Sequence, residues 1–229
     1  MMRQIVAIGG YPDAGNTKLE RYVLDATGKS SPRVCFVPTA SGDDASNVVR
    51  FFETYARLGV GLDVLRFFSR VPADLRAYLF AFDVVQIGGG NTRSMLATWR
   101  HWGFDSVLRE AWERGIVLCG SSAGSICWFE SGVTDSVADA LTTTQGLGIL
   151  SGSNCPHYDG EAERRPAYRR MVAGDELADG LACDDGAGVH FVDTTLHAAI
   201  AASSSARAYR VERAGADAVE TALDMRSLP

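Results

Sequence analysis

The chain has 229 residues, of which 46% are hydrophobic and 22% charged, which is enough to bury a sizeable core and excludes a disordered or fibrous protein. Lys and Arg number 22 against 28 Asp and Glu, a net charge of −6. The basic residues form no run, which argues against a nucleic acid or a membrane surface as a partner.

The cysteines and the apolar runs indicate the cellular compartment of the protein. Five scattered cysteines without a Cys-x-x-Cys pair predict reduced thiols, with no disulfide framework and no metal site. The apolar run at the N-terminus is too short for a signal peptide, and no run approaches the roughly 20 residues that span a bilayer. We therefore expect a cytoplasmic protein.

Short apolar runs alternate with helix-length segments through the first half of the chain. Apolar side chains at intervals of three and four predict amphipathic helices over 45–58 and 94–114. The runs between the helices scarcely alternate with polar residues, which is typical of strands buried on both faces. This order predicts a doubly wound, mostly parallel α/β sheet, with its ligand beyond the carboxyl ends of the strands. The predicted strands are 4–8, 33–37, 62–67, 82–87 and 116–119.

The second half, after about residue 141, changes character. A helix is predicted over 164–173, among short strand-like runs that follow one another closely, which predicts antiparallel or mixed strands added to the sheet edge. Without a linker or an internal repeat, we expect a single domain over 1–229, with 220–229 as a loose tail. The short runs are 147–150, 188–192, 196–202 and 208–211.

The segment 120–125, Gly-Ser-Ser-Ala-Gly-Ser, follows the fifth predicted strand and fits the pattern G-x-S-x-G, with Ser122 at its centre. Small neighbours allow a sharp strand-to-helix turn that exposes the hydroxyl beside the free N–H groups of the helix N-terminus. This is typical of a nucleophile elbow. A phosphate-binding turn, or a serine that only caps the helix, is the alternative. The strand-turn-helix context favours a nucleophile.

A nucleophilic serine needs a general base, and the chain has four histidines. His101 lies on a predicted helix, and His190 and His197 lie within predicted strands, where we expect structural roles. His157 lies instead in a polar segment after a short strand, and loops commonly carry catalytic side chains. By elimination we expect His157 to be the base.

The carboxylate that would orient this base stays open at the level of sequence. Asp135 follows the helix after the serine turn, Asp184 and Asp185 precede a late strand, and Asp159 stands two residues from His157. Each is also the kind of residue found in solvent-exposed turns. Spacing does not decide among them.

Three glycines after the fourth predicted strand supply a candidate oxyanion hole. The N–H groups of Gly89 and Gly90, with that of Ala123, could approach a developing negative charge closely. The alternative is a turn that starts the next helix, with Asn91 or Thr92 as its cap. No segment completes G-x-G-x-x-G, so we expect no dinucleotide cofactor.

Together these segments resemble the peptidase E family of serine peptidases, which includes aspartyl dipeptidase and is related to cyanophycinase. The resemblance implies a fold similar to class I glutamine amidotransferases (flavodoxin-like), Ser122 as nucleophile and His157 as base. The third residue it implies is Asp135 or Asp185, with a slight preference for Asp135. The matching segments are Pro-Thr-Ala-Ser at 38–41, Gly-Gly-Gly-Asn-Thr at 88–92, Gly-Ser-Ser-Ala-Gly at 120–124, Pro-His-Tyr at 156–158 and Asp-Asp-Gly-Ala at 184–187.

We accordingly expect a serine exopeptidase that hydrolyses short peptides without a metal or cofactor, as a monomer or homodimer. An N-terminal aspartate in the substrate would need a cation, for which Arg165 is the candidate beside Arg164 and Arg169, and Asn91 and Thr92 are further candidates for substrate binding. The alternatives are an esterase of the α/β-hydrolase type and a non-catalytic, amidotransferase-like binding module.

Overall fold

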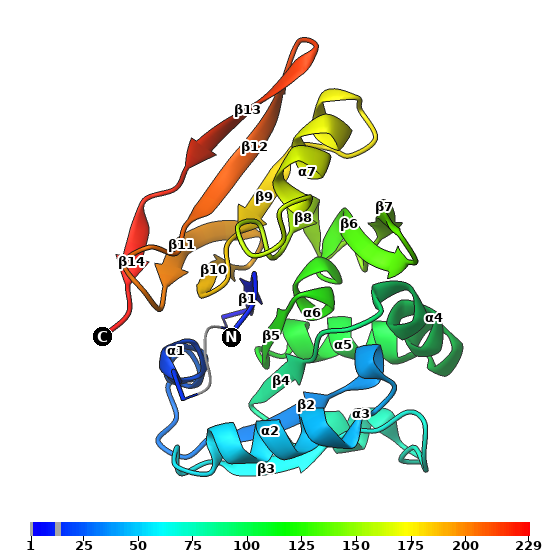
Figure 1. The fold of residues 1–229 in the computed structure, drawn as a ribbon. Helices are drawn as coiled ribbons and strands as arrows, with labels where there is room; N and C mark the ends of the chain where they lie inside the picture. Colours follow the sequence, from blue (N-terminus) through cyan, green and yellow to red (C-terminus); the bar gives the residue numbers. More distant parts are fainter. Residues whose placement is uncertain (1, 12–14) are drawn as a thin grey trace.

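The larger of two sheets has eight strands, in the order β14-β11-β10-β1-β5-β4-β2-β3, in a computed structural model that describes residues 2–11 and 15–229 (Figure 1). β10 (Ala187–Val192) and β11 (Thr195–Ala201) are antiparallel to their neighbours β1 and β10, and β14 (Met225–Ser227) is parallel to β11. The predicted mostly parallel sheet with added antiparallel strands is therefore confirmed. The parallel strands are β1 (Gln4–Ile8), β2 (Arg33–Val37), β3 (Gly61–Val64), β4 (Val84–Ile87) and β5 (Val117–Ser121).

Helices cover both faces of this sheet, as the apolar strands require. Successive residues of β1 point to opposite faces, so that Ile5 packs in one hydrophobic cluster and Val6 in the other. The predicted helix over 94–114 is wrong in one respect: it is two helices, because Gly103 adopts φ 66° and ends the first. The helices are α1 (Lys18–Asp25), α2 (Ala45–Tyr55), α3 (Leu75–Leu79), α4 (Thr92–Trp102) and α5 (Phe104–Glu113).

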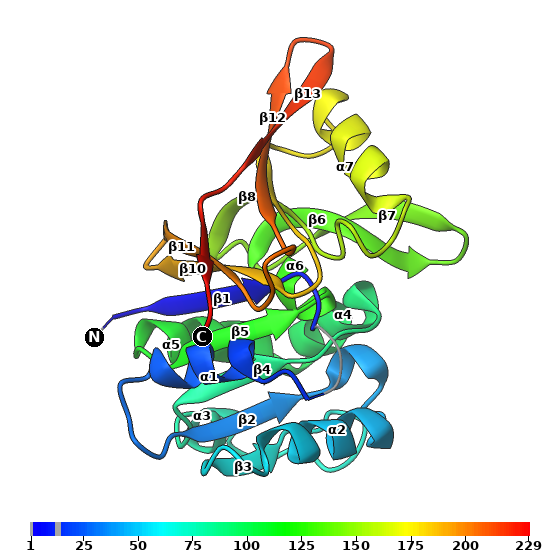
Figure 2. The ribbon, with the colours of Figure 1, turned by 60° about the vertical axis from the view of Figure 1, so that its left-hand side comes forward.

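A second sheet lies beyond the β1–β10 side of the first (Figures 1 and 2), with six strands in the described chain, ordered β13-β12-β9-β8-β6-β7. Of the four short runs that the sequence analysis placed at the edge of the first sheet, 188–192 and 196–202 do join it, whereas 147–150 and 208–211 overlap strands of this second sheet, so that part of the prediction is wrong. The chain leaves the first sheet after the short helix α6 (Ala123–Ile126) and returns to it with β10. The strands are β6 (Phe129–Val137), β7 (Ala140–Gln145), β8 (Leu150–Cys155), β9 (Gly180–Cys183), β12 (Ala208–Ala214) and β13 (Asp217–Ala222).

The C-terminal residues are ordered, contrary to the expectation of a loose tail. β13 forms a hairpin with β12, and α7 (Arg164–Ala173) packs along it (Figure 1). β14 then joins the edge of the first sheet, where the Leu228 N–H donates to the Ala201 carbonyl and the Leu228 side chain is buried. Pairing with a distant strand supplies an order that the polar composition of this segment does not indicate.

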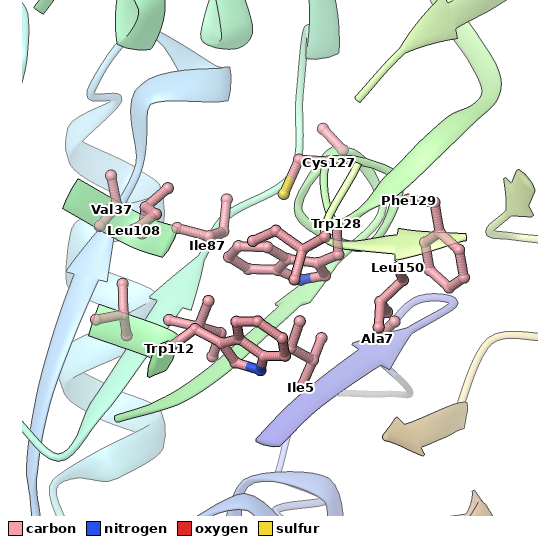
Figure 3. Close-up of a cluster of buried hydrophobic side chains, with 14 of the residues drawn as sticks. Ile5, Ala7, Val37, Ile87, Leu108, Trp112, Cys127, Trp128, Phe129 and Leu150 are labelled. Carbon is pink, nitrogen blue, oxygen red and sulfur yellow. The ribbon is translucent and has the colours of Figure 1, made fainter. Parts of the chain in front are cut away.

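One hydrophobic cluster joins the two sheets (Figure 3). Trp128 and Phe129, at the start of the second sheet, pack with Ile5 and Ile87 of the first, and Trp128 is fully buried. Full burial of an Ile or Phe side chain stabilises the folded state by about 1.5–3 kcal/mol relative to its exposure. The shared core therefore fixes the ends of the parallel strands against the loops of the second sheet.

Candidate active site

Ser122 lies at a strained turn between β5 and α6. Its φ of 57° and ψ of −120° are unusual for a residue with a side chain. Two glycines make the turn possible: a Cβ on Gly120 would lie 2.4 Å from the Gly124 carbonyl oxygen, and one on Gly124 would lie 2.5 Å from that of Ile87. The Ser122 N–H donates to the carbonyl of Ile8 over 3.3 Å, which ties the turn to the end of β1.

The Ser122 side chain is partly exposed, whereas the neighbouring serines are buried. Ser125 donates its hydroxyl to Asn154 over 2.8 Å, and Ser121 is part of β5. Although Ser122 occupies the capping position of α6, its side chain makes no capping hydrogen bond. Of the three serines, Ser122 is the one whose hydroxyl is available for chemistry.

Gly89 and Gly90 lie beside this serine. A Cβ on Gly89 would be 3.1 Å from the Cβ of Ser122, and Gly90 adopts φ 134° against the carbonyl of Ala40. Within the described residues the N–H groups of Gly89 and Gly90 donate to no backbone carbonyl. The N–H of Ala123, the first residue of α6, has no intrahelical acceptor.

Asn91 and Thr92, the predicted substrate-binding residues, make structural contacts. Asn91 caps α4 by accepting from the Ser94 N–H over 2.9 Å. Thr92 is buried and accepts a hydrogen bond from Thr134 over 3.2 Å. The side chain of Thr92 is therefore out of reach of a bound molecule.

His157 and Asp185 form a close pair beside the end of β1. The His157 Nδ1 lies 2.6 Å from Asp185 Oδ1. His157 follows β8 and Asp185 follows β9, and these strands are parallel neighbours, so their carboxyl ends meet at one edge. Gly10 leaves room for the pair, since a Cβ there would be 1.9 Å from Asp185 Oδ1 and 2.7 Å from His157 Cε1.

Asp135, which the sequence analysis slightly preferred as the third residue, lies elsewhere. Its side chain is 60% exposed and is 3.4 Å from the guanidinium of Arg164. The geometry thus favours Asp185 over Asp135, because a histidine ring nitrogen can hydrogen-bond well to one carboxylate.

The other histidines have structural or surface positions, as the sequence predicted. His190 is buried between Tyr22 and Gln4, and burial lowers its pKa to about 4, with His197 nearby as a further cause. His101 is exposed on α4. None of the three joins Asp185.

The backbone that carries Asp185 is held by two acidic neighbours, Asp159 and Asp184, which the sequence analysis considered only as candidate orienting carboxylates. Asp159 Oδ1 accepts from the Asp185 N–H over 2.9 Å. Asp184 accepts from the Arg207 N–H over 2.9 Å, and burial, followed by the charge of Asp159, raises the pKa of Asp184 to about 6. Asp159 was visible as a turn acid two residues after His157, but its partner 26 positions away was not.

The arginines proposed as substrate contacts are already paired. Arg165 binds Glu220, and Arg164 is buried and binds Glu161 over 2.6 Å. Arg169 donates to the Ala218 carbonyl over 3.0 Å. Nor do three or more His, Cys, Asp or Glu side chains of the described residues form a group suited to a metal.

The sequence profile of Peptidase family S51 matches residues 5–199. The chain belongs to this family of serine-type peptidases. It is 44% identical over 232 residues to the uncharacterized peptidase YgaJ of Bacillus subtilis (strain 168), across 99% of this chain and 100% of that protein.

Solved structures show the same fold. A putative peptidase E protein from Listeria monocytogenes EGD-e gives a TM-score of 0.64 at 15% identity, over 86% of this chain and 98% of that one. A peptidase from an acI-B1 Actinobacterium gives 0.68 at 17% identity, over 98% and 95%. In the part of the chain that the structure describes, no helix is both long and apolar enough to cross a bilayer.

Proposed function

We propose that this S51 peptidase is an exopeptidase that hydrolyses short peptides, with Ser122 as nucleophile, His157 as general base and Asp185 as the orienting carboxylate. The observation that carries the proposal is the 2.6 Å contact between His157 Nδ1 and Asp185 Oδ1, next to the end of β1 to which Ser122 is tied. A nucleophile, a base and an orienting acid around one point are what acyl transfer requires.

In the proposed reaction the Nε2 of His157 takes the proton of the Ser122 hydroxyl as the oxygen attacks the scissile carbonyl. Asp185, on Nδ1, holds the ring in the tautomer whose Nε2 is free to accept, and it stabilises the imidazolium that forms. The proton then passes to the leaving amine. Water repeats the sequence on the acyl-enzyme and releases the second product.

The developing oxyanion needs donors that already point at it. The N–H of Ala123 at the start of α6 and that of Gly89, which packs against Ser122, are the proposed pair, with Gly90 next in the loop. One such donor typically contributes about 10²–10³ in kcat. Because these donors belong to the backbone, they need no side-chain ordering during the reaction.

The substrate class follows from what surrounds the serine. An Asp-Xaa preference would need a free cation, and Arg164, Arg165 and Arg169 are each engaged with an acidic side chain or a carbonyl. We therefore propose dipeptide-like substrates with a broader choice at the first residue than aspartate alone.

Two alternatives have less support from the site. An esterase of the α/β-hydrolase type would need a base late in the chain, and His190 there is buried against Tyr22 and Gln4. A non-catalytic module in which Ser122 caps α6 is disfavoured because the side chain makes no capping bond.

The test is a panel of dipeptides, tripeptides and blocked peptides, with matched p-nitrophenyl esters, assayed with the wild type and with Ser122→Ala. We expect hydrolysis of short peptides with a free N-terminus, and a fluorophosphonate adduct on Ser122 of the wild type. Ester turnover without peptide turnover would assign an esterase. An unreactive Ser122 and no turnover would contradict the proposal.

A further inference from the structure

The residue after the proposed base is an anchor in the core. Tyr158 is 1% exposed, and its N–H donates to the Cys183 carbonyl at the end of β9 over 3.1 Å. Its ring packs against Tyr168 and Tyr209, with ring centroids 6.2 and 5.4 Å away. Its hydroxyl donates to Glu220 Oε2 over 2.6 Å.

Glu220 reaches this anchor from the C-terminal hairpin, 62 positions along the chain. Its side chain is 12% exposed, and Arg165 of α7 binds the same carboxylate. The Arg165 guanidinium also lies over the rings of Tyr158 and Tyr209, 5.3 and 5.0 Å from their centroids. A carboxylate shared by a phenol and a guanidinium, and largely shielded from water, is a strong acceptor.

His157 needs an external constraint. Its φ of 52° lies in the left-handed region, which is unfavourable for a residue with a side chain and persists only where the surroundings enforce it. One constraint is local, since the Glu161 N–H donates to the His157 carbonyl over 3.2 Å. The other is Tyr158, which is fixed at its N–H by β9 and at its hydroxyl by Glu220.

We propose that Glu220 is a positioning residue: acting through Tyr158, it holds His157 in the backbone conformation that places the imidazole on Asp185, and Arg165 serves this carboxylate and not the substrate. The inference rests on the proposed function for its effect on turnover. It assigns a role to the C-terminal hairpin, which lies outside residues 5–199 that match the family profile.

A positioning role predicts a specific kinetic pattern. A base displaced by about 1 Å can lower the rate of the chemical step by about 10²-fold. Substrate binding does not involve Glu220 in this proposal, so kcat falls and KM changes little.

The test compares Tyr158→Phe, Glu220→Ala and Glu220→Gln with a matched control. Tyr158→Phe removes one oxygen and leaves the ring in place. Glu220→Gln keeps an oxygen that can accept from the Tyr158 hydroxyl. The control is Asp217→Ala, on the same strand, which also removes a carboxylate that faces an arginine of α7, since Asp217 lies 3.5 Å from Arg169.

We expect Tyr158→Phe and Glu220→Ala to lower kcat by about 10- to 10²-fold, Glu220→Gln to recover most of that loss, and Asp217→Ala to retain wild-type kcat. Thermal unfolding of every variant identifies a change that acts on stability alone. Wild-type kcat in Tyr158→Phe and Glu220→Ala would overturn the inference. So would an equal loss in Asp217→Ala, or no recovery in Glu220→Gln.

Arg165→Ala separates the two roles considered for this arginine. If Arg165 orders Glu220, Arg165→Ala lowers kcat alike for acidic and neutral dipeptides, and its effect is not additive with Glu220→Ala. A rise in KM confined to substrates with an N-terminal aspartate would show a substrate contact and overturn this part of the inference.

A measurement made without substrate tests the inference independently of the proposed function. The chain has four histidines, so ring resonances of isotope-labelled His157 can be assigned by comparison with His157→Gln. Glu220→Ala should shift these ring resonances, and Asp217→Ala should leave them unchanged. If the wild type hydrolyses no peptide, the proposed function fails, while these resonances still decide whether Glu220 positions His157.

Discussion

The two sheets contribute to the site in different ways. The first sheet supplies the proposed nucleophile and oxyanion donors through backbone geometry, at the turns around Ser122 and Gly89, where glycines allow close approach. The second sheet supplies His157 at the end of β8 and Asp185 at the end of β9, held by side chains from elsewhere in the chain. The half of the site around Ser122 is thus determined by a few adjacent residues, whereas the half around His157 and Asp185 depends on contacts between residues far apart in the sequence.

The difference has a physical basis. A main-chain N–H at a helix start is directed once the turn forms, so a short motif is sufficient. A histidine ring has two side-chain torsions and a tautomer to fix, which requires neighbours around it. Substitutions in the first sheet should therefore act through the turn itself, and substitutions in the second through contacts with the base.

The largest expected effect on kcat comes from removing the proposed nucleophile of the first sheet or the proposed base of the second. Ser122→Ala and His157→Ala should each lower kcat by about 10⁴-fold or more, and the double variant should be little worse, because the two act as one unit. Peptide turnover at matched thermal stability measures this. Additive losses would mean that the two halves work independently.

The next largest effect distinguishes the two carboxylates that were considered as the partner of His157. Asp185→Asn should lower kcat by about 10⁴-fold, because an amide does not hold the imidazole in the required tautomer. Asp135→Asn should change turnover by less than about twofold, since an exposed ion pair contributes little. The measurement is turnover of both variants on one dipeptide. The reverse order would restore the family-based preference for Asp135.

Gly10 lies where the two halves meet, and Gly10→Ala probes that junction. The added methyl would overlap Asp185 Oδ1 and the His157 ring, so the pair must move. We expect kcat to fall by about 10²-fold.

Gly28→Ala is the control for Gly10→Ala, because a Cβ at Gly28 meets no atom within 4 Å. With φ 67° at this position, it should lower stability by about 1–2 kcal/mol and leave kcat unchanged. Equal kinetic losses in the two variants would contradict the role given to the junction.

The smallest expected effect concerns the face of the first sheet that α1 covers. Glu20 in α1 is 4% exposed, one of its carboxyl oxygens has no partner among the described residues, and burial raises its pKa from 4.5 to about 7. The folded state therefore holds this proton more tightly than the unfolded state. Stability from this group is complete below about pH 4.5 and is lost as the pH rises through about 7.

Glu20→Gln should remove this pH dependence without affecting the site. We expect the variant to gain about 3 kcal/mol over the wild type at pH 8 and little at pH 4. Denaturant unfolding at the two pH values measures the difference. The same gain at both would show that the carboxyl is not titrating in this range.

The sequence predicted the strands of the first sheet well, for reasons that are local. The strands 4–8 and 33–37 match β1 and β2, since apolar runs between turn residues leave little choice. The prediction of Ser122 as the nucleophile rests on five adjacent residues. Gly103 divides the predicted helix 94–114 into two, and the sequence analysis did not treat this glycine as the end of a helix.

The second sheet was predicted poorly because its strands are polar and its partners are distant. β7 contains Thr142, Thr143 and Thr144, and β8 contains Ser153 and Asn154, so neither gives an apolar run. The pairing of His157 with Asp185 required knowing that β8 and β9 are neighbours. Elimination among four histidines predicted His157 as the base, but no comparable argument separated the aspartates or pointed to Glu220.

The pairing of β1 with β10 joins Gln4 to Val192, so the first strand acquires one of its two neighbours only when most of the chain has been made. Asp185 lies just before β10, in the same late segment. During translation, a ribosome-bound fragment that already carries Ser122 lacks the partner of its base and cannot yet form the complete proposed triad.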